Sequence, residues 1–212
     1  MSDPFTPSNT HPDLRELIAL QLNELAEQRG ETWPPEMRFE GLLHPDDLEI
    51  TCQRTWRDVT SLNPNLSGGA FSACVARFES NGRTHAYFAQ AVQRAGSELW
   101  GVAGMSGGPQ PAEDLERAGG FMLAGGSHVT IGGTGFVPDG GALTVKLADG
   151  SVYGDHARDG CAIVFAPITS EPSPMDEVVI RLLDADGVQL DTSTHWLGDG
   201  KPPPGVKPGP TS

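Results

Sequence analysis

The density of chain-breaking residues limits most strongly what this chain can fold into. Its 212 residues include 27 glycines and 18 prolines, together about a fifth of the chain, where about 12 % is usual. Glycine weakens the interior of a helix, and proline interrupts both helices and central strands. Short apolar runs separated by such residues are typical of turn-rich β architectures. The sequence therefore predicts a mainly β protein.

One early segment departs from this pattern, because residues 11–29 predict an amphipathic helix. Thr10 is a capping residue, Pro12 suits a first helical turn, and Gly30 is a suitable stop. We expect the apolar stripe of this helix to cover a sheet, or alternatively to contact a partner or a second copy. The stripe recurs at helical spacing at Leu14, Leu17, Ile18, Leu22 and Leu25.

About ten short strands are expected after residue 47. Asn81-Gly82 supplies the two positive φ angles of a type I′ turn and predicts a hairpin. Strict alternation in the first strand predicts a shared side for Leu48, Ile50, Cys52 and Trp56. The expected strands cover residues 48–56, 71–78, 85–92, 99–105, 121–124, 129–131, 143–147, 152–153, 161–166, 178–183 and 188–190.

These strands predict an antiparallel β-sandwich, with a partly closed barrel as the alternative. Residues 10–197 are expected to form one mainly β domain, with a subdomain break at 106–120 as the other possibility. Residues 121–197 have the size and turn spacing of an immunoglobulin-like unit, although the paired cysteines of such domains are missing. Residues 1–9 are expected to be flexible, and residues 198–212 to form a disordered Pro/Gly tail.

The charge excludes several classes of partner. The chain carries 28 carboxylates against 14 Lys and Arg, a net charge of −14. This charge repels phosphate backbones and anionic membranes, so neither nucleic acid nor a membrane is an expected partner. It is compatible with a cationic partner. The N-terminus lacks a secretory signal pattern, and no apolar run reaches the ~20 residues of a membrane span.

The three cysteines, Cys52, Cys74 and Cys161, form an odd, widely spaced set within apolar runs. They are interpreted as reduced, buried thiols, and the protein as cytoplasmic.

Candidate chemistry is sparse and scattered. His85, His128, His156 and Cys161 are the residues from which a distributed site could be assembled. Residues 154–161 also place Asp155 and Asp159 near Cys161, as a thiol nucleophile with base and acid would require. The favoured interpretation is an exposed loop before an inert core thiol, so no catalytic residue is assigned.

Metal and phosphate motifs are incomplete. Asp184 and Asp186 with Asp191 resemble the start of a calcium loop, but a third ligand before Gly187 and a later Glu are missing. The glycine-rich stretches at 106–108 and 132–135 lack the Lys-Ser/Thr pair of a phosphate loop. No metal and no cofactor is therefore predicted.

Two functional hypotheses follow. The first is a non-enzymatic β-sandwich module that binds another protein, or itself as a homo-oligomer, through a sheet edge or a loop-bearing end. The alternative is an enzyme or small-ligand binder whose site combines distant His, Cys and Asp residues. The second hypothesis requires at least two of its candidates to lie within hydrogen-bonding distance of each other.

Overall fold

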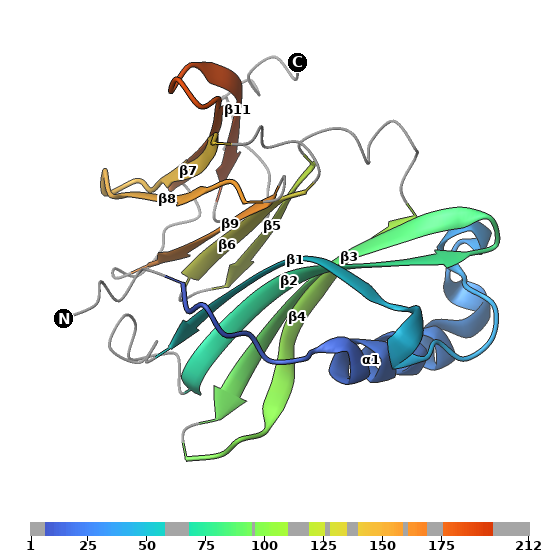
Figure 1. Ribbon diagram of the computed structural model, residues 1–212. Coiled ribbons are helices and arrows are strands. Elements are labelled where there is room, and N and C mark those ends of the chain that lie inside the picture. Colours follow the sequence, from blue (N-terminus) through green and yellow to red (C-terminus); the bar gives the residue numbers. More distant parts are fainter. Residues whose placement is uncertain are drawn as a thin grey trace.

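The computed structural model describes residues 7–57, 68–94, 96–109, 119–125, 128–134, 140–158, 161–168 and 176–196. Figure 1 shows a mainly β chain with an N-terminal helix. The helix α1 spans Arg15–Arg29, and three 3-10 helices span Gly30–Thr32, Pro35–Met37 and Pro45–Asp47. The strands are β1 (Glu49–Arg57), β2 (Gly68–Ser80), β3 (Arg83–Arg94), β4 (Trp100–Pro109), β5 (Gly119–Gly125), β6 (His128–Thr134), β7 (Ala142–Lys146), β8 (Val152–His156), β9 (Cys161–Pro167), β10 (Glu177–Leu183) and β11 (Gln189–Trp196).

The strands form three antiparallel sheets. The first half gives a meander of order β1-β2-β3-β4, and the second half gives sheets of order β5-β6-β9 and β11-β10-β7-β8. If the last seven strands are named A, B, C, C′, E, F and G in chain order, their sheets read ABE and GFCC′. That is an immunoglobulin-like arrangement, in which C′ extends the GFC sheet. The predicted antiparallel sandwich with an N-terminal helix is confirmed.

The layers of the molecule follow from which side chains share a core. The helix α1 lies below the first sheet in Figure 1. It buries Ile18 and Leu22, together with Leu14 at its N-cap, against one face of that sheet. The opposite face of the first sheet packs against β9, and the other face of β9 packs against the β11-β10-β7-β8 sheet. The predicted apolar stripe of the helix is therefore a core element.

Strand β9 belongs to two cores at once. Cys161, Ile163 and Phe165 point toward the first sheet, whereas Ala162 and Val164 point toward the β7 and β10 side chains. All seven residues of the strand are buried. Burial on both faces explains why this segment is a continuous apolar run rather than an alternating one.

A β-bulge in β1 decides which side chains reach β9. Ile50 is opposite Ala76 of β2, but Cys52 is opposite Val75, so Thr51 is an extra residue in the ladder. The bulge reverses the alternation, because two residues on one strand face one residue on the other. Ile50 consequently packs in the helix-side core and Cys52 in the β9-side core. The predicted shared side for Leu48, Ile50, Cys52 and Trp56 is therefore wrong.

The helix begins later than its capping signals predict. It starts at Arg15, and Leu14 occupies the N-cap without a side-chain cap. The residues before it run along the outer edge of β1, where the Ser8 amide donates to the Thr55 carbonyl over 2.6 Å. The Pro12 carbonyl accepts a hydrogen bond from the Gln53 side chain. Because these residues cover a sheet edge, they are not available to form a first helical turn.

The cysteines also differ from expectation. Cys52 and Cys161 form a disulfide between β1 and β9, with Cα atoms 5.7 Å apart and a separation of 109 positions in the sequence. Cys74 is free and fully buried, and burial raises the pKa of its thiol to about 12. The interpretation of three reduced thiols is corrected to one thiol and one disulfide.

Turn predictions are met where the structure describes them. Asn81 and Gly82 have φ angles of 55° and 68° and join β2 to β3, as a type I′ hairpin requires. The predicted Pro/Gly tail at 198–212 lies outside the described residues, as do most of residues 1–9 and residues 110–118 of the predicted break.

Among the described residues, no helix is both long and apolar enough to cross a membrane.

The disulfide predicts a thiol count. Unfolding the protein without a reductant should expose one reactive thiol, Cys74, and unfolding it after reduction should expose three. The native protein should react slowly, because Cys74 is buried and its pKa is raised to about 12. Ellman titration measures all three states. Three thiols without reductant would show that Cys52 and Cys161 are not bonded.

Candidate functional site

The candidates whose side chains the structure describes, His85, His156 and Cys161, do not converge into a site. His85 lies buried in the first sheet, His156 is exposed on β8, and the sulfur of Cys161 is bonded to Cys52. No hydrogen bond joins these side chains, and the side chain of His128 lies outside the described part of the chain. Cys161 is consequently not the free thiol that a nucleophile requires.

The acid nominated beside Cys161 has a structural partner. Asp155 accepts a hydrogen bond from Arg54 over 2.8 Å, and both side chains are at most 8 % exposed. The same carboxylate oxygen accepts the backbone N–H of Ile163 over 2.9 Å. Arg54 also donates to the Cys161 carbonyl over 3.2 Å. These bonds hold β1, β8 and β9 together, because an isolated buried charge would be strongly unfavourable.

In the turn between β10 and β11, the side chain of Asp184 accepts hydrogen bonds from the backbone. One carboxylate oxygen of Asp184 accepts the amides of Asp186 and Val188 over 2.9 and 2.8 Å. Gly187 has a φ angle of 79°, which suits the turn. The hairpin interpretation thus accounts for Asp184 and Gly187. Over the described ranges, no group of three or more His, Cys, Asp or Glu is arranged to hold a metal.

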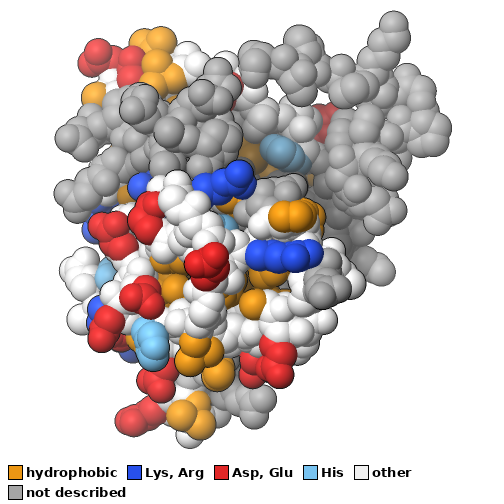
Figure 2. Space-filling model, turned by 90° about the vertical axis from the view of Figure 1, so that its right-hand side faces the viewer, with side chains coloured by type: hydrophobic (Ala, Val, Ile, Leu, Met, Phe, Trp, Pro, Cys, Tyr) orange, Lys and Arg blue, Asp and Glu red, His pale blue; other side chains and the backbone are white. Residues whose placement is uncertain are grey.

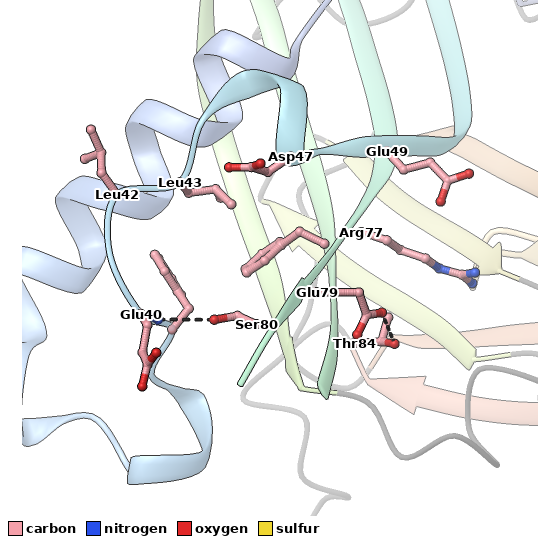
Figure 3. Close-up of a pocket in the computed structure, with 11 residues that line it drawn as sticks. Glu40, Leu42, Leu43, Asp47, Glu49, Arg77, Glu79, Ser80 and Thr84 are labelled. Carbon is pink, nitrogen blue, oxygen red and sulfur yellow. Dashed lines mark hydrogen bonds between the residues drawn. The ribbon is translucent and has the colours of Figure 1, made fainter. Parts of the chain in front are cut away.

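The structure instead shows a groove that the sequence did not indicate. Its volume is about 570 Å³, and it lies where β1 begins and its neighbour β2 continues past it (Figure 3). Glu49 is the first residue of β1 and pairs with Arg77, so Phe78–Ser80 extends beyond the β1 partner. We call the space between residues 39–47 and this end of β2 the acidic groove.

Hydrogen bonds fix residues 39–47, which form the outer wall of the acidic groove. The amide of Glu40 donates to the Ser80 hydroxyl over 3.1 Å. The Asn23 side chain both donates to and accepts from the backbone of Leu43, at 2.9 Å in each case. Asp47 accepts the amide of His44 and closes the turn before β1. The wall is therefore anchored to both α1 and β2.

The acidic groove combines an aromatic base with a negative rim. Phe78 is buried at its base beside Phe39, with ring centroids 5.4 Å apart in an edge-to-face contact. The four carboxylates on its rim are exposed, and Arg77 is the cation that lines it. In Figure 3, Arg77 points away from the wall that carries Leu42 and Glu40. The rim carboxylates belong to Glu40, Asp47, Glu49 and Glu79.

Two of these carboxylates have no competing partner. Thr84 donates to Glu79, and Asp47 is bonded to His44. Glu40 and Glu49 accept no side-chain hydrogen bond from the described residues, and Glu49 forms no ion pair with Arg77. On the face of the molecule that Figure 2 shows, acidic side chains are dispersed rather than gathered in one patch. The groove is thus distinguished by its shape and aromatic base.

Beside the groove, His85 is buried and has no hydrogen-bond partner among the described residues. It is 0 % exposed, and neither ring nitrogen is bonded. Its ring stacks on Phe78 at 4.9 Å and lies edge-on to Phe39 at 6.4 Å. Burial lowers the pKa of His85; Glu79 opposes this shift and Arg83 adds to it. The surroundings therefore favour a neutral imidazole that packs like an aromatic ring.

No protein-family model and no curated protein matches this sequence.

The Arg54–Asp155 pair predicts a non-additive response to mutation. Asp155→Ala should lower the free energy of unfolding by about 3–5 kcal/mol, because it leaves a buried guanidinium unpaired. The double variant Arg54→Met/Asp155→Ala should lose less than Asp155→Ala or Arg54→Met alone, since no buried charge remains. Urea denaturation measures all three values. Losses in the double variant that equal the sum of the single losses would contradict a coupled buried pair.

His85 predicts a loss of stability in acid. Its lowered pKa means that the native state resists a proton that the unfolded chain accepts below about pH 6.5. The free energy of unfolding should therefore fall between pH 7 and pH 5. His85→Phe should make this slope shallower while preserving the stack on Phe78. Part of the slope should remain, because burial also lowers the pKa values of His11 and His195.

His156→Gln is the matched control, since His156 is exposed on β8. A slope that stays unchanged in His85→Phe would show that His85 does not titrate differently in the folded and unfolded states.

Proposed function

We propose that this protein is a non-enzymatic binding module that accepts a basic, extended segment of a partner protein in the acidic groove. The observation that carries the proposal is the rim of four carboxylates around the Phe39 and Phe78 base, beside an end of β2 that β1 does not cover. A lysine or arginine side chain matches both parts of this lining. Its charged end suits the rim, and its apolar stem suits the aromatic base.

Binding in the acidic groove would depend on several weak contacts, because each type of contact that it offers contributes little free energy. Exposed ion pairs contribute about 0.2–1 kcal/mol each, and a cation over an aromatic face contributes about 0.5–1 kcal/mol at an exposed site. The end of β2 adds backbone donors and acceptors that an extended peptide can pair with. A segment with alternating basic residues would use the rim and the strand end together. Such binding should weaken with added salt.

The alternative of a site assembled from distant residues has less support. Cys161 is bonded to Cys52, and no hydrogen bond joins the described histidines of that hypothesis to it or to each other. Self-association and a cytoplasmic location stay predictions. The Cys52–Cys161 bond bears on the second point, because disulfides persist mainly in oxidising compartments.

A labelled peptide tests the proposal. The probe is an eight-residue peptide of alternating Lys and Thr, and the measurement is fluorescence anisotropy at low ionic strength. Saturable binding to the wild-type protein is expected. Glu40→Lys/Glu79→Lys should weaken it about tenfold or more, because two rim attractions become repulsions.

The matched control is Glu177→Lys/Asp186→Lys. It makes the same change in net charge on exposed residues of the immunoglobulin-like unit. It should bind the peptide nearly as the wild type does. Equal weakening in both double variants would attribute binding to overall charge rather than to the groove. An absence of saturable binding to the wild type would overturn the proposal.

A further inference from the structure

A second, smaller pocket lies at the tip of the β2–β3 hairpin. Its volume is about 280 Å³, and we call it the hairpin pocket. It is smaller than the about 300–1,000 Å³ of sites for drug-sized molecules, so it suits a ligand with few atoms. None of its lining residues also lines the acidic groove. These residues are Pro35, Arg38, Asn81, Arg83 and His85.

The turn and the alternation of β3 bring the polar lining together. Asn81 is the first residue of the type I′ turn, with a φ angle of 55°, and Arg83 is the first residue of β3. Side chains two positions apart in a strand point to the same side, so Arg83 and His85 share one side of the hairpin. The facing wall is held by Arg38, whose Nε donates to the Trp33 carbonyl over 2.9 Å. The Asn81 side chain donates to the Arg38 carbonyl over 3.4 Å and ties this wall to the turn.

The buried imidazole of His85 lacks the partner that such a group normally has. The side chain is 0 % exposed, and neither ring nitrogen is hydrogen-bonded within the described part of the chain. A neutral imidazole carries one donor and one acceptor, and buried polar groups are nearly always paired with protein, water or an ion. The stacked Phe78 ring covers a face of the imidazole and offers it no hydrogen bond. A ligand in the hairpin pocket would supply the missing partner.

The charge of the hairpin pocket favours an anion. Arg83 is exposed, and it forms no hydrogen bond or ion pair with the other described residues. Arg38 is counted only as part of the wall, because it is already bonded to Trp33. None of the described residues that line the pocket carries a carboxylate, although the chain has a net charge of −14. An acidic protein therefore presents here a cation and neutral donors without a competing acid in the lining.

We propose that the hairpin pocket binds a tetrahedral oxyanion of the phosphate type, held by Arg83, Asn81 and His85. A planar guanidinium presents parallel N–H donors that fit two phosphate oxygens. The Asn81 amide and the imidazole N–H add neutral donors. The other imidazole nitrogen is an acceptor, so it can pair with the O–H of a partly protonated phosphate. The ligand is either the free ion or the phosphate group of a small monoester.

Calorimetric titration of the full chain with inorganic phosphate tests this proposal, with the ionic strength kept constant by sodium chloride. Saturable binding at one site is expected. Arg83→Gln should weaken it about tenfold, because charge-assisted hydrogen bonds to the phosphate oxygens are lost. The position is exposed, so this variant should fold as the wild type does. Arg181→Gln is the matched control, since it removes an exposed arginine from β10, and it should leave binding unchanged.

His85→Phe tests the buried partner separately. It keeps an aromatic ring against Phe78 but removes both nitrogens, so it should weaken phosphate binding about fivefold. Glu40→Lys/Glu79→Lys changes the acidic groove and should not weaken phosphate binding, which makes this test independent of the peptide site. The proposal is overturned if phosphate shows no saturable binding, or if either Arg83→Gln or His85→Phe binds it as the wild type does.

A parallel titration with methyl phosphate distinguishes the two sources of the anion. Tighter binding of inorganic phosphate assigns the hairpin pocket to the free ion. Binding of the monoester that is equal or tighter assigns it to the phosphate group of a larger ligand. Both results support an oxyanion site, provided that Arg83→Gln weakens binding of the same ligand.

Discussion

A β-strand presents successive side chains to opposite sides, and β9 uses both sides for packing. Its odd-numbered residues complete the core on one face of the first sheet. Its even-numbered residues complete the core that β9 shares with β7 and β10. Each half of the molecule therefore lacks part of its interior without this strand. The seven residues of β9 therefore connect the first sheet and its helix to the immunoglobulin-like unit by packing against both.

The polar chemistry of the molecule is organised around the same strand. Asp155 and Arg54 cross from β8 to β1 directly beside β9, and Cys52 reaches Cys161 on the strand itself. Asp155 and Cys161 were candidates for catalysis in the sequence, but their bonds to Arg54 and Cys52 make them structural. The acidic groove lies elsewhere, at the end of β2 that β1 does not cover.

Local signals predicted the fold well, whereas long-range contacts could not be predicted. The stripe at Leu14, Ile18 and Leu22 and the turn at Asn81-Gly82 each depend on a few adjacent residues, so spacing was sufficient. The Thr51 bulge has no comparable signal, and it moved Cys52 to the opposite face. The disulfide and the ion pair join residues more than 100 positions apart. The acidic groove is visible only once residues 39–47 are placed beside β2.

The position of β9 along the chain has a consequence for synthesis on the ribosome. The first sheet can pair its strands as soon as β4 has emerged, but the face that carries Trp56, Phe71 and Phe88 is completed by residues 161–165. Until then, this aromatic face lacks the side chains of Cys161, Ile163 and Phe165. Nascent chains that stall or end before β9 would expose it, and exposed aromatic surfaces of this kind attract chaperones and promote aggregation. The two halves are thus better regarded as one unit of biosynthesis than as separable modules.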